Sequence, residues 1–136
     1  NNFTKEEMKL IWETHKILDP SIQVQATCVR VPVFNGHSEA VFFRVLEEIS
    51  REEIIKILDR TPGLKVLDDP SSGDYPTPFE NATDTEDVYV GRIRSQSLDD
   101  DCWISMWIVA DNVYGKGAAL NAVQICEELL NVSSVK

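Results

Sequence analysis

Residues 26–41 read ATCVRVPVFNGHSEAV, and the order of residue types along this stretch decides the expected fold. Residues 22–33 are rich in Val, Ile and Thr, which predicts a β-strand, and Pro32 suggests that this strand lies at an edge or ends there. The Asn-Gly dipeptide at 35–36 is typical of a chain reversal. The apolar pattern resumes over residues 38–46 as a second strand, so the stretch predicts a hairpin.

The hairpin matters because it would bring Arg30 and His37 toward one pocket. A fully extended chain would separate them by roughly 23 Å, at about 3.3 Å per residue, and would place them on opposite faces of a sheet. An arginine suits bidentate recognition of a carboxylate or phosphate, and a histidine suits proton transfer near neutral pH. The alternative for Arg30 is a structural ion pair, and the alternative for His37 is a capping histidine without a chemical role. Spacing alone favours the capping interpretation of His37.

Composition limits the class of protein. The chain has 136 residues, the size of one domain, and 43% are hydrophobic, which is enough for a core. Its longest apolar run, residues 103–110, is too short to span a bilayer. The net charge of −10 argues against partners such as nucleic acid or an anionic membrane, since both require a basic surface.

The three cysteines form neither a Cys-x-x-Cys motif nor a metal-binding spacing, so we expect neither a disulfide framework nor a metal site. This cysteine usage suits a protein of the reducing cytoplasm. The chain begins with Asn-Asn rather than Met, which suggests a processed chain or a fragment.

The remaining elements follow from local signals. Thr4 and Glu7 have capping-box spacing, which predicts a helix that ends before Asp19-Pro20, and Ser50 with Glu53 predicts a second helix. The first helix should bury an apolar stripe made of Met8, Ile11, Trp12, His15 and Leu18. Further strands are expected over residues 64–67, 87–94 and 103–110, a surface loop over 68–87, and a last helix over 117–130.

These elements predict an α+β domain spanning residues 1–136, with a mixed, mostly antiparallel sheet and helices on one face. Trp103 and Trp107 share one face of their strand, so another layer or a partner subunit should cover that face. Glu13 and Lys16 lie three positions apart on the polar side of the first helix. They form either a solvated ion pair, which the spacing favours, or part of a cleft.

Four segments carry a resemblance to a known family: ETHKIL (13–18), TCVRVPVFNGHSEAV (27–41), VGRIR (90–94) and WIVADNVYGKGAALNAVQICE (107–127). Together they resemble aspartate-β-semialdehyde dehydrogenase over nearly the whole chain and in the same order. The resemblance implies a carboxy-terminal domain like that of glyceraldehyde-3-phosphate dehydrogenase. It also implies an enzyme that reversibly converts aspartyl phosphate, NADPH and a proton into aspartate semialdehyde, phosphate and NADP. That reaction lies at the branch toward lysine, diaminopimelate, methionine and threonine.

The resemblance also implies roles for individual residues. His37 falls on the family's acid/base histidine, and Arg30 falls on the arginine that grips the substrate carboxylate. Glu13 falls on the glutamate that binds the substrate amine, and Lys16 on the phosphate-binding lysine. Asn112 falls on a position that contacts the NADP cofactor near the nicotinamide. On this basis Glu13 and Lys16 would line a substrate site rather than form a solvated pair.

Two parts of the family's pattern are missing from the sequence. It lacks the amino-terminal NADP-binding domain with its glycine-rich turn, and none of its cysteines, Cys28, Cys102 and Cys126, lies in the context of the nucleophile that forms the thioacyl intermediate. The chain is therefore expected to be a carboxy-terminal substrate-binding and dimerisation portion, inert alone and part of a homodimer. The alternatives are an N-acetylglutamyl-phosphate reductase and a non-catalytic dimerisation or small-anion binding module.

Overall fold

The computed structural model describes residues 1–116 and 118–133. The chain divides into two compact units, Asn1–Pro32 and a second unit that begins at Val33, and each is described by itself. The expectation of one domain over residues 1–136 stays a prediction.

The first unit is built on α1, which spans Lys5–Ile17. Thr4 caps it as predicted: the Glu7 amide donates to Thr4 Oγ1 (3.2 Å), and the Thr4 amide donates to Glu7 Oε2 (2.7 Å). The other oxygen of Glu7 accepts from the Cys28 amide (2.9 Å), so one carboxylate ties the later chain to the start of the helix. The amides of Thr4 and Cys28 lower the pKa of the Glu7 carboxyl, because they stabilise its charged form.

The predicted strand over residues 22–33 is wrong, and with it the hairpin. This segment is extended but forms no ladder with another described strand. It is held instead by the bond from Cys28 to Glu7 and by His15, whose Nε2 donates to the carbonyl of Ile22 (2.8 Å). Propensity for β structure describes a side chain that fits a pleated surface, and it produces a strand only where a partner supplies the hydrogen bonds.

The chain does bend where the Asn-Gly turn was expected, and Gly36 has a left-handed φ of 96°. A strand follows this bend, but no strand precedes it among the described residues.

The apolar stripe predicted for α1 is not buried. The exposed fraction is 57% for Trp12 and 71% for Leu18. Glu7 is the one residue of α1 that is buried. A helix with a single extended segment is too small a unit to enclose a helix face.

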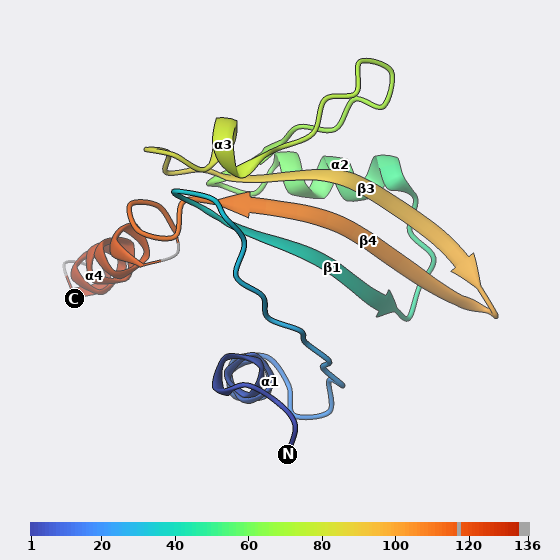
Figure 1. The fold of residues 1–136 in the computed structure, drawn as a ribbon, viewed down its shortest axis with the longest axis horizontal. Coiled ribbons are helices and arrows are strands. Elements are labelled where there is room, and N and C mark those ends of the chain that lie inside the picture. Colours follow the sequence, from blue (N-terminus) through green and yellow to red (C-terminus); the bar gives the residue numbers. More distant parts are fainter. Residues whose placement is uncertain (117, 134–136) are drawn as a thin grey trace. The chain divides into compact units, whose positions relative to one another are not determined.

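The second unit is organised around a four-stranded sheet with the order β1-β4-β3-β2. β1 pairs with β4 and β4 with β3 in antiparallel fashion, and β2 pairs with β3 in parallel. Figure 1 shows β1, β4 and β3 side by side, with β4 in the middle. The α+β class and the mixed, mostly antiparallel sheet are therefore confirmed. The strands span His37–Val45 (β1), Leu64–Val66 (β2), Val88–Leu98 (β3) and Asp101–Ala110 (β4).

One face of the sheet packs against α2, which spans Arg51–Asp59 and begins at the predicted cap, Ser50. Ile54 of α2 is buried against the sheet, where it meets Val90, Ile93 and Ile104. The sequence predicted this helix correctly because both of its signals are local: the capping box and the apolar residues at helical spacing.

A β-bulge interrupts β3. The register against β4 shifts between Gly91 and Arg94, and Arg92 has a left-handed φ of 53°, which is uncommon for a residue with a side chain. Asp68 stabilises the bulge: its Oδ1 accepts from the Arg92 amide (2.7 Å) and its Oδ2 accepts from the Ile93 amide (3.0 Å). The carboxylate thus replaces the ladder bonds that the bulge removes.

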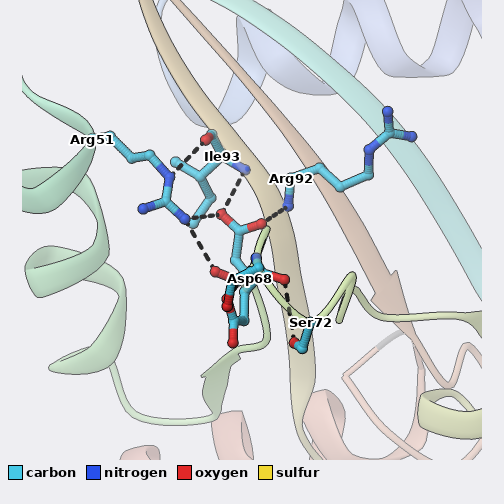
Figure 2. Close-up of polar contacts among 7 residues, drawn as sticks. Arg51, Asp68, Ser72, Arg92 and Ile93 are labelled. Atoms are coloured by element: carbon cyan, nitrogen blue, oxygen red, sulfur yellow. Dashed lines mark hydrogen bonds and ion pairs between the residues drawn. The ribbon is translucent and has the colours of Figure 1, made fainter.

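Arg51 completes this network from α2. Its Nη2 donates to Asp68 Oδ2 (2.8 Å), and its Nε donates to the carbonyl of Ile93 (3.1 Å). Figure 2 shows the guanidinium and the carboxylate facing one another, while the side chain of Arg92 extends away from them. The Asp68 side chain is only 6% exposed, so the pair links helix, loop and bulge in a shielded position.

The opposite face of the sheet is covered in part by the chain that follows β2. The predicted loop over residues 68–87 contains the short helix α3, Pro78–Asn81. Trp107 Nε1 donates to the carbonyl of Pro76 (2.9 Å), which holds the loop against this face. Farther along the same face, Phe42 is 68% exposed and Trp103 is 39% exposed. The face that was expected to be covered is therefore covered only around Trp107.

The last element is α4, Ala119–Ser133. It confirms the predicted helix and extends beyond its expected end at residue 130. Its expected start, Gly117, lies outside the described residues.

Candidate functional site

The five predicted site residues fall in both units. Glu13, Lys16 and Arg30 belong to residues 1–32, and His37 and Asn112 belong to the second unit. The structure therefore groups them as three and two.

Glu13 and Lys16 project from exposed positions of α1. No ion pair joins them within the described chain, whereas Lys9 of the same helix does pair with Glu6 (Nζ to Oε1, 3.1 Å). The solvated pair that spacing favoured is therefore not formed. Both charges are exposed and lie near each other on the helix surface.

Arg30 lies on the extended segment and is exposed. Its guanidinium makes no hydrogen bond or ion pair to any residue that the structure describes. With Lys16 it gives the first unit two cations without a carboxylate partner in an acidic chain, and such groups are suited to an anionic ligand.

His37 is the first residue of β1. Its Nε2 lies 2.6 Å from Oε1 of Glu39, two residues farther along the strand. Side chains at i and i+2 of a strand point to the same face, which explains why the two meet. Sequence reasoning missed Glu39, and that spacing was the signal that could have identified it.

Asn112 is placed beside His37 by the strand register. His37 pairs with Ala110 at the end of β4, and Asn112 follows two residues later in an exposed loop. Two residues far apart in the chain thus lie at the same end of the sheet. Neither the composition nor the local pattern of the sequence could have revealed this pairing.

The loop that carries Asn112 is organised by Asp111. Its Oδ1 accepts from the amides of Val113 and Tyr114 (both 2.8 Å), and its Oδ2 accepts from the amide of Asp84 (3.1 Å). The amide of Val113, with those of Tyr114 and Asp84, lowers the pKa of the Asp111 carboxyl against an opposing effect of burial. Asp111 was also missed, although an aspartate that opens a turn commonly accepts from amides two and three residues later.

None of the three cysteines makes a described contact with His37. Cys102 is buried and pairs with Val45, at the opposite end of the β1–β4 ladder from His37. Cys126 is exposed on α4, and Cys28 is partly buried in the first unit. All three are free thiols.

Two shallow clefts lie elsewhere in the second unit. One, of about 190 Å³, lies between Trp107, Arg92 and residues 75–78, and the other, of about 640 Å³, lies between Pro62-Gly63 and α4. Neither is lined by His37 or Asn112. Across the described residues there is no group of three His, Cys, Asp or Glu side chains that could hold a metal, and none of the helices is long and apolar enough to cross a membrane.

The two units carry different chemical groups, and each unit is described by itself. The second unit supplies an imidazole that is hydrogen-bonded to a carboxylate, which can exchange a proton, and a nearby amide. The first unit supplies two cations and a carboxylate, which can bind a ligand with both signs of charge.

A comparison with protein families matches residues 1–114 to a model described as semialdehyde dehydrogenase, dimerisation domain. The chain belongs to this semialdehyde dehydrogenase family. Among relatives, it is 49% identical over 130 residues to the aspartate-semialdehyde dehydrogenase of Legionella pneumophila, covering 95% of this chain and 37% of the relative. It is 48% identical over 131 residues to that of Aquifex aeolicus, covering 96% of this chain and 38% of the relative.

Solved structures of semialdehyde dehydrogenases agree. The crystal structure of aspartate semialdehyde dehydrogenase II from Vibrio cholerae complexed with ASA superposes with a TM-score of 0.86 at 46% identity, covering 95% of this chain and 37% of that one. A probable aspartate-semialdehyde dehydrogenase from Pseudomonas aeruginosa gives a TM-score of 0.82 at 35% identity, covering 93% and 37%. The resemblance found in the sequence is thus confirmed. The chain spans little more than a third of the length of these semialdehyde dehydrogenases.

Proposed function

We propose that the chain is the carboxy-terminal substrate-binding and dimerisation part of a longer NADP-dependent aspartate-semialdehyde dehydrogenase. The complete enzyme would reversibly convert L-aspartyl 4-phosphate and NADPH into L-aspartate 4-semialdehyde, phosphate and NADP. It would act in the cytoplasm, in lysine, diaminopimelate, methionine and threonine biosynthesis. The observation that supports this most is the placement of His37, paired with Glu39, beside the loop that carries Asn112.

The free charges of the first unit support roles in substrate binding. Arg30 would clamp the substrate carboxylate, because a guanidinium presents two parallel donors to the two carboxylate oxygens. Lys16 would bind the phosphate as a point charge, and Glu13 would balance the substrate ammonium. The absence of an ion pair between Glu13 and Lys16 within the described chain leaves both available for these roles.

His37 would handle the proton. In the direction of reduction a hydride and a proton are consumed and phosphate leaves, so the site needs a group that can both hold and release a proton near neutral pH. His37 is exposed at the edge of the sheet, where a substrate bound by another part of the enzyme could reach it.

Among the described residues, Asn112 is the one that we propose contacts NADP. The side-chain amide of Asn112 is exposed on a loop that Asp111 holds in shape, so it could exchange hydrogen bonds with the carboxamide of the nicotinamide. The described residues include no glycine-rich turn between a strand and a helix that could cradle the dinucleotide phosphates. NADP would supply the hydride chemistry, and other parts of the enzyme would bind most of it.

The complete enzyme would act as a homodimer. The exposed Phe42 and Trp103 on one face of the sheet and the description of the matched family support this assembly. The isolated chain should be catalytically inert, because none of its three cysteines lies in the sequence context of the family's nucleophile and the described residues include no phosphate cradle. An isolated preparation that reduces NADP in a phosphate-dependent way would contradict this expectation.

Two other functions remain to be tested. An N-acetylglutamyl-phosphate reductase would use similar chemistry on a different acyl phosphate, but its substrate has no free ammonium for Glu13 to balance. A non-catalytic dimerisation or anion-binding module would use the same cations without turnover.

The test is an assay of the full-length protein that contains this chain, with phosphate, NADP and either L-aspartate 4-semialdehyde or N-acetylglutamate 5-semialdehyde. We expect NADP reduction with the first aldehyde at least on the order of a hundred-fold faster in kcat/KM, since a site built around polar groups strongly rejects a substrate that leaves them unpaired. Faster reduction with the second aldehyde would establish the alternative reductase. A folded, phosphate-binding protein without turnover on either would indicate the binding module.

A further inference from the structure

The contact between His37 and Glu39 indicates a role for Glu39. His37 Nε2 and Glu39 Oε1 are 2.6 Å apart, within hydrogen-bond distance and at the short end for a nitrogen donor and a carboxylate. A carboxylate can only accept, so the proton of this bond belongs to Nε2 of the histidine. The neutral imidazole then has its second nitrogen, Nδ1, unprotonated.

The backbone beneath this pair is a regular β-strand. His37 pairs with Ala110 and Glu39 pairs with Ile108, so both side chains project from a hydrogen-bonded part of the β1–β4 ladder. Their spacing within one strand sets the distance between them without any help from a loop. A site built on strands is more precise than one built on flexible segments.

Stability does not explain the pair. The side chains of His37 and Glu39 are 56% and 46% exposed, and ion pairs at such positions contribute little to folding because water screens them and side-chain entropy opposes them. Neither side chain has another partner among the described residues. The effect of the contact is therefore on the orientation and tautomer of the imidazole.

We propose that Glu39 is a positioning residue of the dehydrogenase. It holds His37 as the tautomer protonated at Nε2 and directs Nδ1 toward the reacting groups, so that Nδ1 is the atom that accepts and returns the proton. This inference rests on the proposed function of His37. It extends that function by naming the residue that orients the histidine and the ring atom that reacts.

The positions of the neighbouring charged groups agree with this assignment. Arg44 of β1 is engaged by Asp101 of β4 (3.0 Å), at the far end of the strand from His37. Asp111, on the loop beside the histidine, has both of its oxygens occupied by backbone amides. Within the described part of the second unit, Glu39 is thus the carboxylate that contacts the imidazole.

Kinetics of the full-length protein test the proposal first. Glu39→Ala should lower kcat by roughly ten-fold or more, the scale of loss when the carboxylate partner of a metal-binding histidine is removed, with KM for aspartate semialdehyde within about two-fold. Glu39→Gln should retain part of the activity, since its amide oxygen can still accept from Nε2. Glu47→Gln, an exposed acidic position just after β1, is the matched control and should behave as wild type.

A double variant separates positioning from a general structural effect. Because Glu39 acts through the histidine, Glu39→Ala should slow turnover no further once His37 is already Gln. Multiplied losses in the double variant, or wild-type kcat in Glu39→Ala, would overturn the proposal.

A measurement that does not need turnover makes the two proposals distinguishable. The imidazole of His37 can be labelled with ¹⁵N in the full-length protein, and its signals can be assigned by their loss in His37→Gln. We expect the shift pattern of an Nε2-protonated ring in wild type and a mixture of tautomers in Glu39→Ala. The same pattern in both would refute the role of Glu39, even if the protein is an active dehydrogenase. Wild-type protein with the expected pattern but no turnover would refute the proposed function and leave the contact established.

Discussion

Asp111 is a single carboxylate that gives the loop beside His37 its shape. It is 6% exposed and accepts from the amides of Val113, Tyr114 and Asp84. Replacing one carboxylate oxygen by an amide group would leave at least one of these donors without an acceptor. The shape of the loop therefore depends more on Asp111 than on its neighbour Asn112.

We expect Asp111→Asn to lower the free energy of unfolding by about 1–3 kcal/mol, the cost of an unsatisfied buried polar group. Denaturant unfolding of the full-length protein would measure the change. Asp74→Asn, at an exposed loop position, is the control and should change stability by less than about 0.5 kcal/mol. Equal effects of the two substitutions would contradict the account of the loop.

Asp111 should also make stability depend on acid. The amide of Val113 and its neighbours lower the pKa of Asp111 in the folded protein, so the folded state binds a proton more weakly than the unfolded state does. The contribution is complete above the unfolded pKa of about 3.9 and is lost as pH falls through the folded pKa. Unfolding midpoints measured from pH 6 downward, roughly over this range, should fall less steeply in Asp111→Asn than in wild type.

At the scale of elements, the bulge in β3 depends on a residue outside the strand. Asp68 accepts from the amides of Arg92 and Ile93 and pairs with Arg51 of α2, as Figure 2 shows. The left-handed φ of Arg92 is thus stabilised by contacts that reach it from the loop and, through Arg51, from the helix.

Asp68→Ala should therefore lower the free energy of unfolding by about 1–3 kcal/mol, since it leaves the amides of Arg92 and Ile93 without their acceptor, while Arg51 keeps its bond to the carbonyl of Ile93. Asp69→Ala is the matched control. The Asp69 carboxylate is exposed, and it accepts from the amide and the hydroxyl of Ser71, two residues farther along the chain. Its cost should be about 1 kcal/mol or less. A similar loss for both would show that the bulge does not depend on Asp68.

The elements also show where the sequence was sufficient. The capping boxes at Thr4 and Ser50 predicted helix starts correctly, because both partners of each bond lie within four residues. The strand predicted over residues 22–33 failed, because its hydrogen bonds would have needed a neighbour that local propensity cannot specify. The pairing of His37 with Ala110 is of the same kind: it decides where Asn112 lies and depends on the register of distant strands.

At the scale of the whole molecule, one apolar face of the sheet is only partly covered. Phe42 and Trp103 are exposed on the face that the sequence analysis expected to be covered by another layer or a partner subunit. Apolar exposure of this kind in a folded protein is typical of an interface. The proposed homodimer would cover this face.

Phe42→Asp should therefore shift the full-length protein toward monomers, because it would bury a charge in the proposed interface. Sedimentation over a range of concentrations would show at least a ten-fold rise in the dimer dissociation constant, which corresponds to about 1.4 kcal/mol. Ile57→Asp, which replaces an exposed apolar residue of α2, is the control and should leave the assembly unchanged. An unaltered dimer in Phe42→Asp would place the interface elsewhere.

The most direct test of the central claim uses the two histidines of the chain as a matched pair. In the full-length protein, phosphate-dependent reduction of NADP by L-aspartate 4-semialdehyde should fall by about 10²–10⁴-fold in kcat for His37→Gln, the usual contribution of a general acid–base group. His15→Gln, which removes only the bond to the carbonyl of Ile22, should retain near-normal turnover. Near-normal turnover in His37→Gln, or equal losses in both variants, would contradict the claim that this chain supplies the proton-transfer residue of a semialdehyde dehydrogenase.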